Sequence, residues 1–107
     1  MDINDSLLGK HAPLLSAIKA SLRDVPGASD LLAREDFDRD GVILFSPKAS
    51  KSKLRFFLSR EFLEDFTPDD IMARLRYYRV ADKLRSLPPR STLFVTTEGT
   101  FTEPSTD

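Results

Sequence analysis

The run Asp36-Phe37-Asp38-Arg39-Asp40-Gly41 is the part of the chain whose residue types and spacing come closest to a specific chemistry. Three carboxylates stand at alternate positions, a glycine follows, and the apolar Ile43 comes two residues later. An EF-hand calcium loop begins in this way, because alternate side chains and a sharp glycine turn bring oxygen atoms around one ion. The run is therefore the first candidate for a binding site.

The residues that follow do not complete a calcium loop. Calcium requires about six to eight oxygen ligands, and the twelfth residue of the loop supplies two of them as a bidentate glutamate. Counting from Asp36, the twelfth residue is Pro47 and the ninth is Leu44. Residues 42–45 favour a strand, where an EF-hand requires a helix. We therefore expect no metal ion and no cofactor.

A tight turn explains the same residues better. Asp38 and Gly41 occupy the first and fourth positions of a type I turn, where aspartate and glycine are preferred. The Asp38 carboxylate can accept a hydrogen bond from the backbone N–H two residues further on. The run is thus predicted to be the turn that begins a strand at residue 42.

No other motif predicts a catalytic site. The chain has no cysteine, which excludes thiol catalysis and cysteine-bound zinc. Its one histidine, His11, would need a nucleophile and an orienting acid to form a hydrolytic triad. Ser6 and Asp5 are near it in sequence only, and the chain contains no glycine-rich phosphate loop and no nucleophile elbow. We therefore expect that the protein is not an enzyme.

The charged residues are segregated along the chain, although the net charge is only −1. Residues 47–60 carry five basic and no acidic side chains, residues 61–70 carry five acidic and no basic ones, and residues 71–90 carry six basic and one acidic. The basic segments 48–60 and 74–90 could form a weak, salt-sensitive nucleic-acid-binding surface. Its candidate residues are Lys48, Lys51, Lys53, Arg76, Arg79 and Lys83.

Ordinary helix chemistry accounts for much of this charge. Asp69 and Asp70 begin a predicted helix, and Lys83 and Arg85 lie near its end, as the helix dipole favours. Residues 53–58 lack the glycines of an RRM strand, and the chain has no GXXG loop. Nucleic-acid binding is therefore the alternative hypothesis, and a solvated surface is the simpler interpretation.

The elements that must position these residues are predicted from apolar spacing and from helix caps. Apolar residues at helical spacing indicate a first helix, with Pro13 in its first turn and Pro26-Gly27 at its end. Residues 3–10 are expected to add a loose turn, and residues 31–37 a short helix in preference to an edge strand. A helix over 60–66 follows the cap Ser59.

A long helix over residues 68–87 is the best-defined element. Thr67 caps it, Pro68 takes the first position, and Pro88-Pro89 end it. Two apolar stripes are expected along it, one of Ala73, Tyr77, Val80, Leu84 and Leu87 and the other of Ile71, Leu75 and Tyr78.

Residues 42–58 are predicted to form an antiparallel hairpin around a polar loop at 47–52. Residues 92–96 and 100–102 are predicted to be two further strands around the turn Glu98-Gly99. Alternation in the second strand of the hairpin places Leu54, Phe56 and Leu58 on one face and Lys53, Arg55 and Phe57 on the other.

These elements predict one α+β domain over residues 1–103, with a frayed tail at 104–107. A small antiparallel sheet, made from the hairpin 42–58 and the strands at 92–102, packs on one face against the N-terminal helix and the 68–87 helix. The sequence shows no signal peptide and no apolar stretch long enough to span a membrane, so we expect a soluble protein of the cytoplasm.

The sheet face away from the helices is left for water or a partner. Arg55 and Phe57 are expected on this face, and arginine and aromatic residues are enriched in protein interfaces. The sequence therefore predicts a non-enzymatic protein-binding module, meaning an adaptor, a regulatory subunit or a self-associating subunit. Its expected partner-binding residues are Arg55, Phe57, Arg76, Arg79 and Lys83. The alternative for Phe57 is that the N-terminal helix or residues 31–37 cover it.

Overall fold

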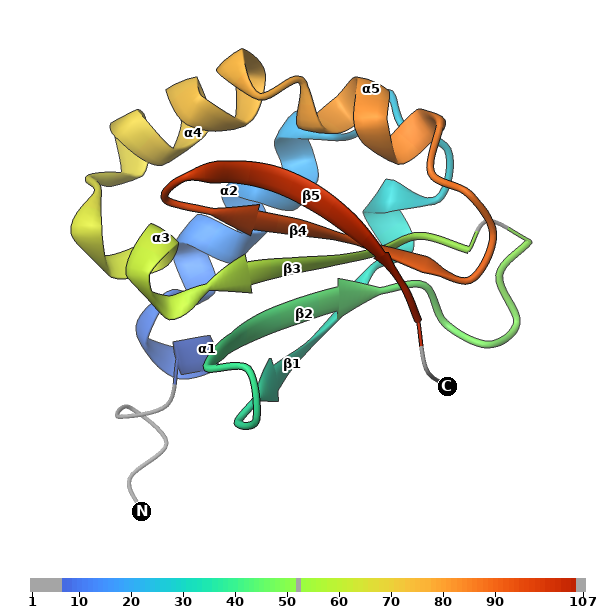
Figure 1. Cartoon of the computed structure of the whole chain (residues 1–107), viewed down its shortest axis with the longest axis horizontal. Helices are drawn as coiled ribbons and strands as arrows, with labels where there is room; N and C mark the ends of the chain where they lie inside the picture. The colour runs from blue at the N-terminus through green and yellow to red at the C-terminus, as the bar shows by residue number, and fades with distance from the viewer. Residues whose placement is uncertain (1–6, 52, 106–107) are drawn as a thin grey trace.

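A computed structural model describes residues 7–51 and 53–105 of the chain (Figure 1). The five strands form one sheet in the order β1-β2-β3-β4-β5, and the helices cover one of its faces, so the predicted α+β fold is confirmed. In chain order the elements are α1 (Leu7–Lys10), α2 (Ala12–Ser21), the 3₁₀ helix η2 (Ala28–Asp30), β1 (Leu32–Asp36), β2 (Gly41–Phe45), β3 (Arg55–Ser59), α3 (Arg60–Asp65), α4 (Pro68–Tyr77), α5 (Val80–Arg85), β4 (Ser91–Thr96) and β5 (Gly99–Pro104).

Neighbouring strands are antiparallel except β3 and β4, which are parallel. The helices α3, α4 and α5 connect these two strands and carry the chain back to the end of the sheet where β3 begins. Parallel strands require such a crossover connection. The prediction of an antiparallel sheet is therefore corrected at this one pair.

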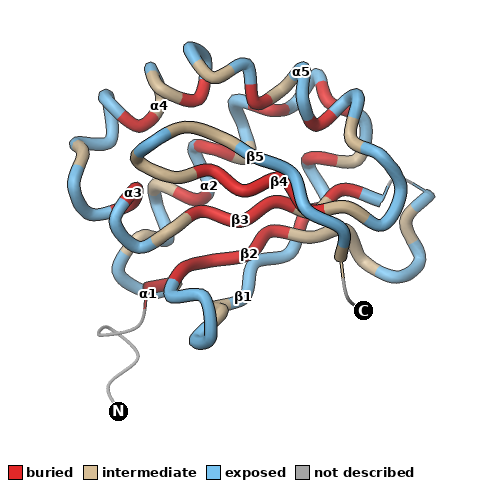
Figure 2. The backbone as a smooth tube through the Cα atoms, viewed as in Figure 1, coloured by how far each residue is buried: buried red, intermediate tan, exposed pale blue. Residues whose placement is uncertain are grey.

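The main core lies between the sheet and the helices (Figure 2). Phe56 and Leu58 of β3 face it, as alternation predicts, together with Val42 and Leu44 of β2. Ile18 of α2 belongs to the same buried cluster. Each fully buried side chain of this size contributes about 1.5–3 kcal/mol relative to exposure. The cluster therefore decides which face of the sheet carries the helices.

Residues 31–37 contain the edge strand β1 and not the predicted short helix. β1 pairs with β2 along its whole length, with Leu32 opposite Phe45. Glu35 faces the helices, and its Oε1 accepts a hydrogen bond from the Leu8 N–H at 3.1 Å. Helix propensity is worth only about 0.7 kcal/mol per residue or less. The hydrogen-bonded ladder to β2 outweighs that preference.

The caps at the starts of α3 and α4 are the predicted ones. Ser59 Oγ accepts the Phe62 N–H at 3.1 Å, and Thr67 Oγ1 accepts the Asp70 N–H at 3.2 Å. Pro68 takes the first position of α4, where its missing N–H leaves no bond unmade. These local signals thus fixed the start of both helices.

The predicted single helix at 68–87 is two helices, because the chain breaks after α4. Ile71 and Leu75 are buried in α4, and Val80 and Leu84 are buried in α5. At about 3.6 residues per turn, Ile71 and Val80 would lie on opposite sides of an uninterrupted helix. The break brings both pairs into one core and leaves Tyr77, predicted to lie beside Val80, 84% exposed.

The break is made by Arg79, which has a φ of 58°. This left-handed conformation costs about 1–2 kcal/mol for a residue with a side chain. The burial of Val80 and Leu84 is enough to offset this cost.

The hairpin of β4 and β5 extends further than predicted. The predicted frayed tail at 104–107 is wrong for its first two residues, since Pro104 ends β5 and the Ser105 N–H donates to the Arg90 carbonyl at 2.7 Å. Residues 106–107 lie outside the described residues, as do residues 3–6 of the predicted loose turn, whose last residues form α1. In the described part of the chain no helix is both long and apolar enough to cross a membrane.

Candidate functional site

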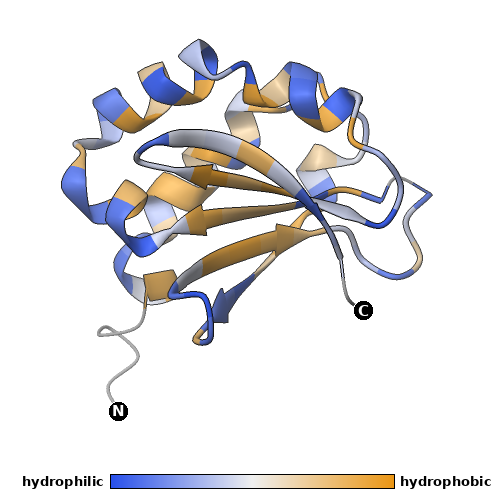
Figure 3. Cartoon of the chain, in the orientation of Figure 1, coloured by the Kyte–Doolittle hydropathy of each residue, from blue (hydrophilic) through white to orange (hydrophobic). Residues whose placement is uncertain are grey.

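The sheet face opposite the helices carries a second apolar cluster. Residues paired across neighbouring strands share a face, so the strand registers place Arg34, Ile43, Phe57, Phe94 and Phe101 in one row across all five strands. Figure 3 shows that β2, β3 and β4 are the hydrophobic centre of the sheet and that β1 is hydrophilic. We call this surface the aromatic face; its residues are Leu32, Arg34, Ile43, Phe45, Arg55, Phe57, Phe94 and Phe101.

Three phenylalanines pack side by side along this row. The ring centroids of Phe57 and Phe94 are 5.4 Å apart, and those of Phe94 and Phe101 are 4.8 Å apart with an interplanar angle of 6°. Aromatic pairs of this kind contribute about 0.5–1.5 kcal/mol each beyond the area that they bury. The row therefore ties β3, β4 and β5 together on the side away from the helices.

Phe57 lies on the predicted face, but it does not project as an exposed anchor. Phe57 and Phe94 are only 4% and 5% exposed. The turn between β1 and β2 folds toward them, so that the Arg39 guanidinium lies over the Phe94 ring at 4.8 Å. Arg39 Nη1 is also 3.5 Å from Glu103 Oε2 on β5. Arg39 and Phe101 of β5 therefore cover the Phe94 ring, and no helix of the described chain lies over this face.

Gly41 is required where Phe57 packs. A Cβ on Gly41 would lie 2.3 Å from the Leu58 carbonyl oxygen and 2.4 Å from Cζ of Phe57. No such atom fits, because carbon atoms in contact stay about 3.5–4.0 Å apart. The glycine at the end of the acidic run thus admits the Phe57 ring.

The turn between β1 and β2 differs in detail from the predicted one. Asp36 Oδ1, and not Asp38, accepts the backbone bond, from the Arg39 N–H at 3.2 Å. Asp40 takes a left-handed φ of 58°, and its Oδ1 is 2.6 Å from Arg60 Nε. That hydrogen bond raises the pKa of Arg60. Among the described residues, no three acidic or histidine side chains gather closely enough to hold a metal ion.

A cavity of about 380 Å³ lies over the aromatic face, and we call it the aromatic cavity. The buried Ile43, Phe57 and Phe94 form its floor, and charged side chains line its rim. Ligand cavities are usually about 300–1,000 Å³, so this one is large enough for one or two side chains. Its lining residues are Asp36, Asp38, Arg39, Ile43, Arg55, Phe57, Thr92, Phe94, Pro104 and Ser105.

A second cavity of about 400 Å³ adjoins the first, because Arg55 and Ser105 line both. It lies where β2 and β5 end and where β3 and β4 begin. We call it the cationic cleft. Its lining residues are Phe45, Ser46, Lys53, Leu54, Arg55, Pro89, Arg90, Ser91 and Ser105.

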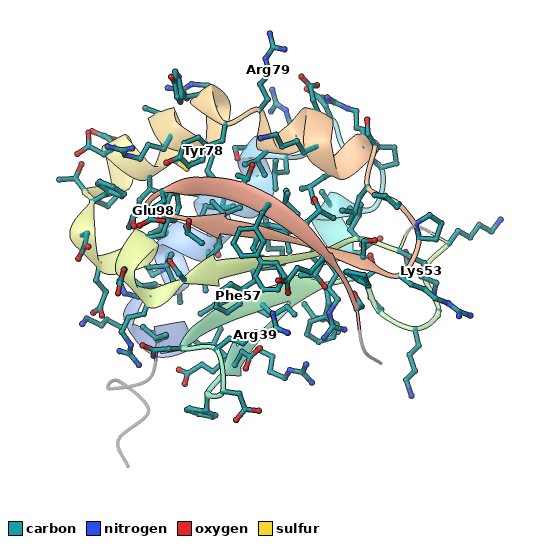
Figure 4. The ribbon with its side chains drawn as sticks, viewed as in Figure 1. Arg39, Lys53, Phe57, Tyr78, Arg79 and Glu98 are labelled. Carbon is teal, nitrogen blue, oxygen red and sulfur yellow. The ribbon has the colours of Figure 1, made fainter. Side chains whose placement is uncertain are left out.

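The structure does not gather the other predicted site residues at this face. Arg76 and Arg79 line a separate cavity of about 450 Å³ between α2 and the α4–α5 pair. Lys83 Nζ donates to Thr100 Oγ1 at 2.5 Å. Figure 4 shows Arg79 projecting away from the sheet, whereas Phe57 and Arg39 lie over it.

The predicted basic residues of the hairpin loop lie beside the cationic cleft. Lys53 lines the cleft, and its Nζ donates to the Lys48 carbonyl at 3.0 Å. Lys51 and Lys53 also line a cavity of about 340 Å³ with Arg85 of α5. The structure therefore brings Lys53 to Arg55, but it leaves Arg76 and Arg79 elsewhere.

His11 lies apart from both cavities of the aromatic face. Its Nε2 is buried and has no hydrogen-bond partner among the described residues. Burial lowers the pKa of His11 below 6.5, although the nearby Glu64 opposes this shift. The side chains lining the cavity beside it include no serine or threonine. Ser6 and Asp5 lie outside the described residues. The described residues that line this cavity therefore give His11 no hydroxyl group to activate.

Most residues of the site were missed from the sequence, and four of them matter most for the argument. They are Arg39, Arg90, Phe94 and Phe101. The predicted turn at Glu98-Gly99 does not give the pairing of the two phenylalanines, because the observed turn is Thr97-Glu98, and this register places Phe94 opposite Phe101. Arg39 and Arg90 reach the site through tertiary contacts that no local pattern encodes.

The comparisons with known proteins return nothing: no family model, no curated protein and no solved structure matches this chain. The function therefore has to be argued from the geometry of the site.

Proposed function

We propose that the protein is a non-enzymatic protein-binding module whose aromatic face takes an extended segment of a partner protein. One observation carries the proposal. Leu32 and Phe101 stand at the two edges of this face and are 49% and 48% exposed, although both are large hydrophobic side chains. The aromatic cavity lies between them, lined by Phe57 and Phe94. Exposed apolar residues around a cavity with a polar rim are typical of an interaction surface.

The dimensions favour an extended segment. Strands are about 4.8 Å apart, so the four spacings between Leu32 on β1 and Phe101 on β5 amount to about 19 Å. An extended chain advances about 3.3 Å per residue, so about six residues cross this face. The aromatic cavity would receive one or two of their side chains.

Nucleic acid fits the face less well. Single-stranded nucleic acid binds by stacking its bases on exposed rings, but Phe57 and Phe94 are buried and Arg39 already covers Phe94. The rim also carries Asp36 and Asp38, which would repel phosphate. A mixed surface of arginine and aromatic residues is common in protein interfaces. These features support a protein partner.

Addition of a strand to the β1 edge of the sheet is disfavoured. The exposed edge of β1 consists of Leu-Ala-Arg-Glu-Asp, and charged side chains protect edge strands from pairing. In a two-fold pair that uses the whole strand, Arg34 would lie opposite Arg34 of a second copy, and like charges directly opposite are destabilising. The aromatic face is therefore the proposed surface. We further propose that the module works in the cytoplasm, which cell fractionation would test.

Peptide display followed by NMR tests the proposal. Decapeptides selected from a random library on the intact chain should shift the backbone amide signals of β2–β5. Phe101→Ser should weaken their binding by about tenfold, and Tyr77→Ser should not. Tyr77 is a matched control, because it is an exposed aromatic residue on α4. Peptides that shift only helix signals, or that bind Phe101→Ser unchanged, would refute the proposal. If a second copy of the chain binds the aromatic face instead, the same amide signals would shift with protein concentration when no peptide is present.

A further inference from the structure

We infer that the cationic cleft binds carboxylate groups of the same partner segment, so that the partner is acidic next to its apolar anchor. This inference rests on the proposed function and names the chemistry of its partner. The cleft adjoins the aromatic cavity at Arg55 and Ser105, so one extended segment can reach both.

The charge of the cleft carries the inference. Lys53, Arg55 and Arg90 line it, and none of its lining residues in the described chain is acidic. Ser46, Ser91 and Ser105 add hydroxyl groups that can donate hydrogen bonds. Arginine binds a carboxylate with two parallel N–H bonds. The cleft therefore offers the charge and the donors that a carboxylate needs.

The parallel strand pair brings these cations together. Phe56 of β3 lies opposite Leu93 of β4. Because parallel strands run in the same direction, the residues that precede them stand at the same end of the sheet. Lys53 and Arg90 each come three residues before that pair. The crossover through the helices is thus what assembles the cleft from two distant segments.

The backbone also holds Arg90 in an unusual conformation. Arg90 has a φ of 60°, and its carbonyl oxygen accepts the Ser105 N–H at 2.7 Å. Backbone strain of this kind persists only where surrounding contacts hold it, and it is common in binding sites. Lys53 is also tethered, through its hydrogen bond to the Lys48 carbonyl. The Lys53 ammonium group and the Arg90 backbone are therefore held in place before any partner arrives.

The surroundings favour carboxylates of a peptide over phosphates of a nucleic acid. Asp36 and Asp38 line the adjoining cavity, and Glu103 lies at its edge beside Arg39. A polyphosphate chain would pass these carboxylates, whereas a peptide can place an uncharged side chain there. Alternate residues of an extended chain point to the same side about 7 Å apart. A segment with an apolar residue and an acidic residue two positions away therefore fits the two adjoining cavities.

The test uses the peptide that binds the intact chain most tightly after selection from a random decapeptide library, together with a copy in which each Asp and Glu is replaced by Asn or Gln. The acidic peptide should bind about tenfold more tightly than its neutral copy and should shift the amide signals of Arg90, Ser91 and Ser105. Arg90→Gly should reduce the affinity of the acidic peptide toward that of the neutral copy, with Lys53 and Arg55 retaining part of the difference. The melting temperature should change by only a few degrees, because glycine adopts the backbone conformation of Arg90 readily.

Arg79→Gly is the matched control, since Arg79 is also an exposed arginine with a positive φ and lies outside the cleft. It should leave the affinity for both peptides unchanged. Equal affinity of the acidic peptide and its neutral copy, or selection of peptides without acidic residues, would overturn the inference and leave the proposed function standing. Tighter binding of an oligothymidylate than of the peptide at the cleft would overturn it in favour of a phosphate ligand. Failure to select any peptide that shifts β2–β5 signals would overturn both proposals.

Discussion

Replacing Gly41 with alanine should destabilise the protein strongly, because the new methyl group has no space. Its carbon would lie 2.3 Å from the Leu58 carbonyl oxygen and 2.4 Å from Cζ of Phe57. Leu58 is fully buried and Phe57 nearly so. Relief of both overlaps requires β2 to move away from the Leu58 backbone of β3 and the Phe57 ring to leave its position.

The magnitude follows from these two costs. Overpacking a buried site costs about 1–3 kcal/mol, and a displaced Phe57 would also lose its contact with Phe94, worth about 0.5–1.5 kcal/mol. We therefore expect Gly41→Ala to lower the free energy of unfolding by about 2–4 kcal/mol. At about 4–8 °C per kcal/mol for a domain of this size, the melting temperature should fall by roughly 8–32 °C.

Urea unfolding followed by circular dichroism measures this loss, and a double mutant identifies its cause. Leucine at position 57 lacks the ring atoms that overlap, so Gly41→Ala should cost about 1 kcal/mol less in a Phe57→Leu background. Gly99→Ala is the control. A Cβ on Gly99 would have no atom within 4 Å, and the φ of Gly99 is 130°. The loss of unfolding free energy in Gly99→Ala therefore comes from the backbone and should be the same with Phe57 and with leucine at position 57. A Gly41→Ala loss below about 0.5 kcal/mol, or an equal loss with and without Phe57, would refute the packing argument.

Three further predictions concern the histidine, a helix cap and the acidic turn. Burial lowers the pKa of His11, so the unfolded chain takes up the proton first as the pH falls. The His11 contribution to the free energy of unfolding should be constant above pH 6.5 and should fall as the pH drops from 6.5 toward the folded-state pKa. His11→Gln should remove this pH dependence in urea titrations. If the pH dependence persists, another group causes it. Ser59→Ala removes the acceptor for the Phe62 N–H and should cost about 1 kcal/mol in the same assay, and an unchanged midpoint would show that the cap is dispensable. Millimolar calcium should leave the melting temperature unchanged; a rise of several degrees that disappears in Asp38→Ala would overturn the assignment of the run as a turn.

Local chemistry made the caps and the strand faces predictable. Ser59 and Thr67 bond to backbone groups three residues away, so both partners lie in the same short window of sequence. The alternation of Phe56 and Phe57 is likewise local, and it placed them on the correct faces. The exposure of Phe57 was not predictable, because it depends on Arg39 and on the distant β5.

The two wrong helices have a common cause. Helix propensity favoured a helix at residues 31–37 and an unbroken one at 68–87, but both choices ignore which side of the element must be buried. An unbroken helix would have exposed either Ile71 or Val80, and tertiary burial of both outweighed the cost of a left-handed Arg79. The apolar spacing indicates the break only if Ile71 and Leu75 are taken to face the same core as Val80 and Leu84, because one continuous helix cannot turn both pairs to the same side.

The candidate site was predictable only where it lies on one strand. Arg55 and Phe57 are neighbours on β3, and alternation found both. The approach of Arg90 to Lys53 depends on the parallel register of β3 and β4, which the sequence does not encode locally. If β3 and β4 were antiparallel, Lys53 and Arg90 would lie at opposite ends of the sheet. The wrong strand direction therefore gave no indication of the cleft.

The acidic run that resembles a calcium loop now has a different meaning. Asp36 holds the Arg39 N–H, Arg39 crosses to Phe94, and Gly41 admits the Phe57 ring, so the run builds one wall of the aromatic cavity. Its carboxylates offset nearby arginines at that end of the face, whereas the cationic cleft at the other end has no acidic lining residue in the described chain. The electrostatic potential is therefore more positive at the cleft than at the turn. A partner segment should bind in one direction, with its apolar residue in the aromatic cavity and its carboxylates at the cleft.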